Sequence, residues 1–70
     1  SKEIKEGFQE LGLEVPDFKN LSRKNTLSKI EAFTAKFNEI QNPSENLKKL
    51  NLLFNGLKEL EPSLIPQSWI

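Results

Sequence analysis

The sequence contains no cysteine, no histidine and no tyrosine. Without cysteine there are no disulfide bonds and no thiolate ligands for a metal. Without histidine the chain lacks the side chain that most often acts as a general base near neutral pH, so a serine nucleophile would have no imidazole to activate it. The three glycines are isolated, so no glycine-rich loop is present to hold a nucleotide phosphate. We therefore expect no enzyme activity, no cofactor and no metal site.

Long apolar runs are also missing. No stretch approaches the roughly 20 apolar residues of a membrane-spanning helix, and the first residues lack the pattern of a secretory signal peptide. We therefore expect no membrane partner and an intracellular location, cytoplasmic or nuclear.

The chain has no excess of either charge. Ten basic and ten acidic side chains cancel to a net charge of zero, which argues against a general phosphate-binding surface. The distribution is uneven, however, because residues 15–36 hold five basic and two acidic side chains.

What the sequence does have is helical periodicity. Its 70 residues suffice for one small domain, which buries about 60% of the surface of its unfolded chain. Proline and other turn residues separate three amphipathic segments, and no alternating pattern persists. The sequence predicts an all-α fold, a small three-helix bundle over residues 1–61 with helices at about 2–11, 26–41 and 43–61 and an extended, apolar, proline-containing tail over 62–70. The short loops predict antiparallel neighbours.

The first helix has recognisable ends. Ser1 is placed to cap its N-terminus. Gly12 is placed for the left-handed residue that follows a helix, with Leu13 packing back on Phe8 in a Schellman motif. Gly7 lies beside the apolar stripe. It is either a tolerated glycine that costs up to about 1 kcal/mol or a point where another helix approaches closely.

The other two helix starts allow alternatives. The second helix is expected to begin near Asn25 or Thr26, although Ser28 and Glu31 could form a capping box further along. For the third, Asn42 suits the N-cap and Pro43 the first helical position. The apolar stripes of the three helices, together with one residue of the first connection, predict a core of Ile4, Phe8, Leu11, Phe18, Leu27, Ile30, Phe33, Phe37, Ile40, Leu47, Leu50, Phe54, Leu57 and Leu60.

Acidic residues line the first helix at spacings of 3, 4 and 4, at Glu3, Glu6, Glu10 and Glu14. The favoured interpretation is a solvated face, because amphipathicity requires polar side chains opposite an apolar stripe. The alternatives are a contact with a basic patch on a partner or a weak contact with a divalent ion.

The segment Leu21–Glu31, LSRKNTLSKIE, resembles the turn and recognition helix of helix-turn-helix repressors. The resemblance implies binding in the DNA major groove. Against it stand the zero net charge and Pro16, which falls where the preceding helix should run. An ordinary capped helix N-terminus is the favoured interpretation. A small DNA- or RNA-binding domain remains the alternative function, with the candidate residues Lys19, Arg23, Lys24, Lys29 and Lys36.

The tail suggests a different function. Tryptophan and large aliphatic side chains are typical of protein interfaces, and the tail carries Leu64, Ile65, Trp69 and Ile70. They are expected either to fold back over the end of the bundle or to contact a partner. Leu52 lies off the main stripe of the third helix and is expected to be exposed.

We therefore expect a non-catalytic protein–protein interaction module, a docking or scaffold domain that is part of a larger protein. Its partner would be another protein or another part of the parent chain. Self-association stays open, because the 3-4-3 spacing of apolar residues in the third helix is also that of a coiled coil. The expected partner-binding residues are Leu52, Leu64, Ile65, Trp69 and Ile70.

Overall fold

The computed structural model describes residues 1–60. The elements are three α-helices and one short 3₁₀ turn: α1 (Lys2–Glu10), η1 (Phe18–Asn20), α2 (Arg23–Glu39) and α3 (Glu45–Glu59). No strand occurs within this part of the chain. The predicted all-α, three-helix fold is confirmed, and the predicted tail lies outside the described residues.

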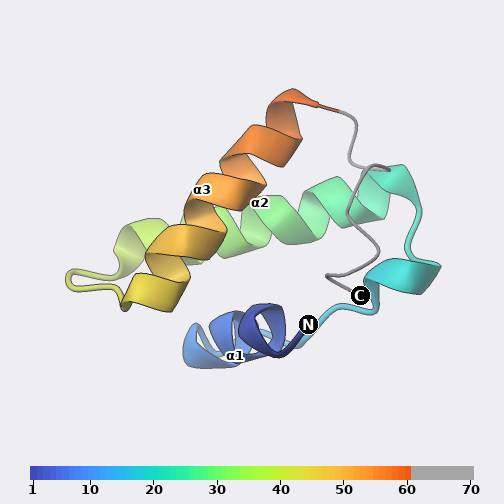
Figure 1. Ribbon diagram of the computed structural model, residues 1–70. Coiled ribbons are helices and arrows are strands. Elements are labelled where there is room, and N and C mark those ends of the chain that lie inside the picture. The colour runs from blue at the N-terminus through green and yellow to red at the C-terminus, as the bar shows by residue number, and fades with distance from the viewer. Residues whose placement is uncertain (61–70) are drawn as a thin grey trace.

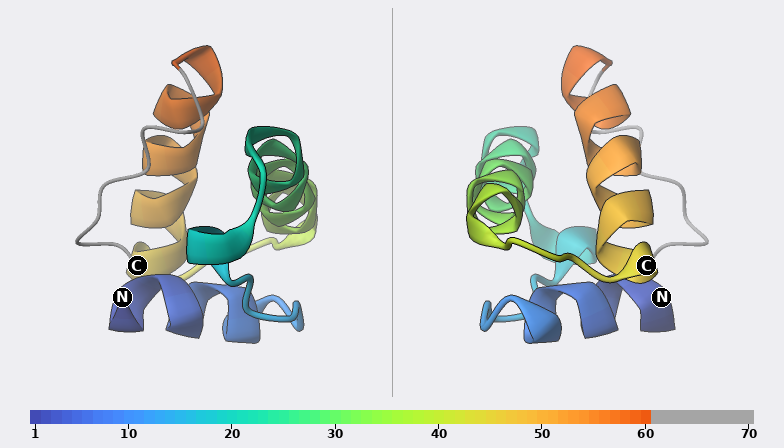
Figure 2. Two further views of the ribbon diagram at one scale, coloured as in Figure 1. Left: turned by 90° about the vertical axis from the view of Figure 1, so that its right-hand side faces the viewer. Right: turned by 90° about the vertical axis from the view of Figure 1, so that its left-hand side faces the viewer.

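The helices cross one another around a single core. α3 returns across α2 in the opposite sense and at a steep angle (Figure 1). α1 lies crosswise beneath the N-terminal end of α3 (Figure 2). The expected reversal of direction therefore holds for α2 and α3, which a short connection joins. It does not hold for α1, because the longer connection over residues 11–22 lets α1 turn away from both.

The end of α1 is the predicted Schellman motif. Gly12 has a φ of 72°, and its N–H donates to the Gln9 carbonyl at 3.0 Å. The Leu13 N–H donates to the Phe8 carbonyl at 2.9 Å, and Leu13 packs against the core. At the other end the Ser1 hydroxyl accepts from the Ile4 N–H at 3.3 Å. Both ends of α1 could therefore be predicted from the sequence.

The predicted starts of the other two helices were wrong by a few residues. α2 begins at Arg23, earlier than expected, because the Ser22 hydroxyl accepts from the Asn25 N–H at 3.2 Å. α3 begins at Glu45, later than expected, because Ser44 is the N-cap in place of Asn42.

Ser44 has a tertiary partner that explains this choice. Its hydroxyl accepts from the Leu47 N–H at 3.2 Å and also donates to Glu10 Oε2 at 3.0 Å. Close by, Asn46 Nδ2 donates to the Glu3 carbonyl at 2.9 Å. The N-terminus of α3 is thus capped and bonded to α1 at once.

The core contains most of the predicted residues. Nine of them are buried: Ile4, Phe8, Leu11, Ile30, Phe33, Leu47, Leu50, Phe54 and Leu57. Phe18, Leu27 and Phe37 are half-buried. The 3-4-3 spacing in α3 therefore faces the core of the domain and leaves no coiled-coil seam there for self-association.

Two predicted core positions are wrong. Ile40 is 41% exposed and Leu60 is 64% exposed. Each follows the last residue of its helix and has an extended backbone, with ψ of 125° at Ile40 and −165° at Leu60. The helical periodicity that placed them inward had already ended, so their side chains leave the stripe.

Three phenylalanines, one from each helix, meet at the centre. The ring centroid of Phe33 lies 5.2 Å from that of Phe8 and 5.0 Å from that of Phe54. The rings of Phe8 and Phe54 are 6.1 Å apart, and Phe18 meets Phe8 edge-on at 6.0 Å. These tilted contacts are favourable for aromatic pairs and connect all three helices.

Replacing Ser44 by alanine should lower the free energy of unfolding by about 1–2 kcal/mol, since the helix loses its cap and α1 loses a hydrogen bond. Urea unfolding followed by far-UV circular dichroism measures the change. Ser28→Ala is the control, because Ser28 is exposed within α2 and alanine is the better helix former. Equal effects of the two substitutions would contradict the assigned cap.

Candidate functional site

The acidic side chains of residues 1–60 do not gather into a metal-binding group. No group of three or more histidine, cysteine, aspartate or glutamate side chains within residues 1–60 is close enough to hold a metal ion. The four glutamates of the acidic stripe are exposed, as a solvated face requires. Glu10 is bonded to Ser44, and Glu6 lies 3.9 Å from Lys2. These two acidic side chains therefore have structural contacts within the domain.

The side of α3 that faces away from the core carries two exposed leucines. Leu52 is 73% exposed and Leu53 is 38% exposed, and Leu60 follows at the end of the helix. The predicted exposure of Leu52 is confirmed, whereas its role in binding stays a prediction. We call Lys49, Leu52, Leu53, Gly56, Glu59 and Leu60 the outer face of α3.

The outer face of α3 has a hollow and a stretch of uncovered backbone. A hollow of about 530 Å³ is lined by Leu52 and Leu53 together with Glu45, Lys48 and Lys49. At Gly56, four residues after Leu52, an added Cβ would meet no atom within 4 Å, so the backbone there is bare. A protruding leucine thus lies one helical turn from an open stretch of backbone.

Charged groups stand at both ends of the apolar part. Lys49 lies one turn before Leu52 and Leu53, and Glu59 lies one turn after Gly56; both are exposed. Lys48, next to Lys49, pairs with Glu45 at 3.3 Å within the same helix. The outer face of α3 is therefore basic near its start, apolar in the middle and acidic near its end.

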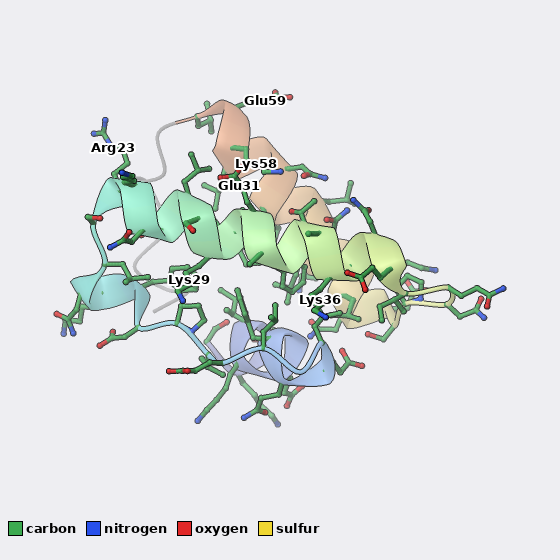
Figure 3. All side chains as sticks on the ribbon, turned by 180° about the vertical axis from the view of Figure 1, so that it is seen from behind. Arg23, Lys29, Glu31, Lys36, Lys58 and Glu59 are labelled. Atoms are coloured by element: carbon green, nitrogen blue, oxygen red, sulfur yellow. The ribbon has the colours of Figure 1, made fainter. Side chains whose placement is uncertain are left out.

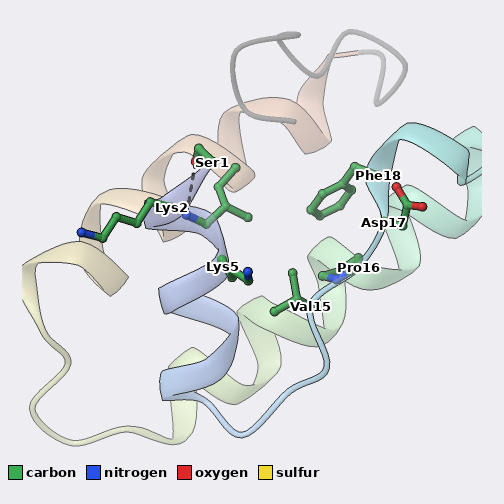
Figure 4. A pocket seen from close by; sticks show the side chains of 8 residues that line it. Ser1, Lys2, Lys5, Val15, Pro16, Asp17 and Phe18 are labelled. Carbon is green, nitrogen blue, oxygen red and sulfur yellow. Dashed lines mark hydrogen bonds between the residues drawn. The ribbon is translucent and has the colours of Figure 1, made fainter.

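A second hollow lies beside the first turn of α1 (Figure 4). It measures about 480 Å³ and is lined by Ile4, Val15, Pro16 and Phe18, with Ser1, Lys2, Lys5 and Asp17 around them. It forms because the connection after α1 runs past the start of that helix. Nothing among the described residues points to a ligand for it.

The basic residues of the nucleic-acid alternative do not form one patch. All five are exposed, but they are spread over η1 and α2. Lys29 and Lys36 point to the side of α2 on which α1 lies, whereas Arg23 points to the opposite side (Figure 3). Lys29 and Lys36 therefore share one side of α2, and Arg23 does not lie with them.

The helix-turn-helix resemblance lacks its first helix. Ahead of α2 the chain forms only the single turn Phe18–Asn20, and residues 13–17 are not helical. A helix-turn-helix unit joins two helices through a turn of about three or four residues. The connection from α1 to α2 is much longer, so α2 is an ordinary capped helix.

The remaining predicted partner-binding residues, Leu64, Ile65, Trp69 and Ile70, lie outside the described residues. The sequence analysis did not predict that Leu53 and Leu60 are exposed. A signal for Leu53 was present, because its angular position on the helix lies between Leu52 and the buried stripe, at the edge of the stripe. For Leu60 the signal depended on where the helix ends.

Neither a protein-family model, nor a curated protein, nor a solved structure matches this chain. No helix within residues 1–60 combines the length and the apolar character needed to cross a membrane.

Proposed function

We propose that this chain is a non-catalytic protein–protein docking module and that the outer face of α3 is its docking surface. The observation that carries the proposal is the 73% exposure of Leu52 beside the partly exposed Leu53. Single exposed leucines are normal on soluble proteins, but a group of them on one helix face is typical of interaction sites.

The energetics of a small domain support this assignment. Burying one leucine side chain contributes about 1.5–3 kcal/mol to stability. A domain of this size has few apolar side chains to spare, and only 36% of its residues are hydrophobic. Leaving leucines on the outside of α3 forgoes stabilisation, whereas covering them with a partner recovers it.

The shape of the surface suggests how a partner binds. The exposed Leu52 lines a hollow on this face, which suits an amphipathic helix laid against α3. Charged residues at its two ends can orient such a helix. The partner is another protein, or another part of a larger parent chain, in an intracellular setting.

Capture from a native lysate, with the tagged chain as bait and with or without nuclease, tests the proposal. The unmodified chain should retain the same proteins after nuclease treatment. Leu52→Lys should reduce their recovery about tenfold, as expected for loss of a central interface residue. Ala35→Lys is the matched control, because Ala35 is an exposed residue of α2 and the substitution adds the same charge.

Two outcomes would overturn the proposal. If everything captured disappears with nuclease, the interaction runs through nucleic acid and the basic residues of α2 become the site to map. If Leu52→Lys retains the same proteins as Ala35→Lys, the outer face of α3 is not the docking surface. A Trp69→Ala bait tests in parallel the predicted contribution of the tail.

A further inference from the structure

We propose that the outer face of α3 binds the same face of a second copy of this chain, with the two α3 helices antiparallel about a twofold axis. This inference rests on the proposed function and names its partner. It follows from three properties of the face: a protruding leucine, a bare glycine one turn later, and opposite charges at its two ends.

The apolar middle of the face is complementary to itself. In a twofold interface every contact between two different residues occurs twice, once in each direction between the two copies. If Leu52 of one copy lies on Gly56 of the other, then Leu52 of the second copy lies on Gly56 of the first. Gly56 has nothing within 4 Å of an added Cβ, so the leucine meets open backbone. Both contacts form without rearranging the core.

The charges fix the direction of the pairing. The register that sets Leu52 opposite Gly56 also sets Lys49 opposite Glu59 of the second copy, and does so twice. Both side chains are exposed, and neither forms an ion pair with another side chain of residues 1–60. In a parallel arrangement each lysine would face a lysine and each glutamate a glutamate, which is repulsive. The antiparallel arrangement is therefore the favoured one.

The length of α3, Glu45–Glu59, limits the size of this interface. Contact through one helix from each copy is smaller than a standard interface of about 1,600 Å². We therefore expect a weak dimer, with a dissociation constant above about 10 µM.

Analytical ultracentrifugation from about 10 µM to about 1 mM protein tests this pairing with a charge swap. The unmodified chain should dimerise over this range. Lys49→Glu and Glu59→Lys should each weaken dimerisation at least about fivefold, because each places like charges together at two contacts. The double variant should restore it. Circular dichroism of each variant verifies that the exposed substitutions leave the helices intact.

The results separate this inference from the proposed function. A monomer at the highest concentration, or a double variant as weak as the single ones, overturns the second copy as the occupant. If capture from lysate still depends on Leu52 in that case, the docking function stands with a different protein as partner. If capture is also unaffected by Leu52→Lys, both proposals are wrong.

Discussion

Replacing Phe33 by alanine is expected to lower the free energy of unfolding by about 3–5 kcal/mol. Phe33 has no exposed surface, and its ring contacts the phenylalanines of both other helices. A domain of 70 residues has a total stability of about 4–10 kcal/mol. The variant should therefore lose a large part of the domain's stability, and its unfolding midpoint, followed by circular dichroism on heating, should fall well below that of the unmodified chain.

Phe37→Ala is the control for this prediction. Phe37 lies one turn later on the same helix, is half-buried and packs at the edge of the core. Its loss should cost about 1–2 kcal/mol, because less apolar surface is uncovered. Equal destabilisation by the two alanine substitutions would mean that the three-ring contact is not the centre of the core.

The second large effect is expected at Gly7, where α1 crosses α3. A Cβ added there would overlap Leu50 Cδ1 and lie 3.5 Å from Phe33 Cε2. Leu50 is only 2% exposed, so its side chain has little room to move away. Gly7→Val should destabilise the domain by about 2–3 kcal/mol, despite the better helix propensity of valine. Urea unfolding measures the loss.

Gly56→Val is the matched control, since Gly56 is also a helical glycine but has open space around it. Its stability should change by no more than about 0.5 kcal/mol. The unfolding should be measured at low protein concentration so that self-association does not contribute. A destabilisation as large as that of Gly7→Val would mean that the close approach of α1 and α3 is not what makes Gly7 sensitive to substitution.

The core and the outer face of α3 are separable by mutation because they use opposite sides of one helix. Leu50 and Phe54 point inward and determine whether the domain folds. Leu52 and Lys49 point outward, so their replacement should change association with little effect on unfolding. Measuring both properties for each variant therefore distinguishes loss of binding from loss of structure.

The sequence by itself determined the class of fold and much of the core. Periods of three and four residues, interrupted by proline and turn residues, are local features that require helices separated by loops. The end of α1 was determined in the same way, because a left-handed residue is needed there and Gly12 adopts it without strain. The exposure of Leu52 also followed from its angular position relative to the buried stripe.

Tertiary structure decided what depends on residues far apart in the chain. Asn42 and Ser44 could each cap the N-terminus of α3. Ser44 is the cap in the structure, where its hydroxyl also donates a hydrogen bond to Glu10 of α1. The sequence alone allowed Gly7 to be a tolerated glycine within the helix. The structure shows that a side chain there would overlap Leu50, so glycine is required by the packing of α1 on α3. The direction of α1, and the distribution of the basic residues to different sides of α2, likewise depend on how the helices cross. Helical periodicity specifies which side of each helix is apolar, but only packing between helices fixes which groups meet.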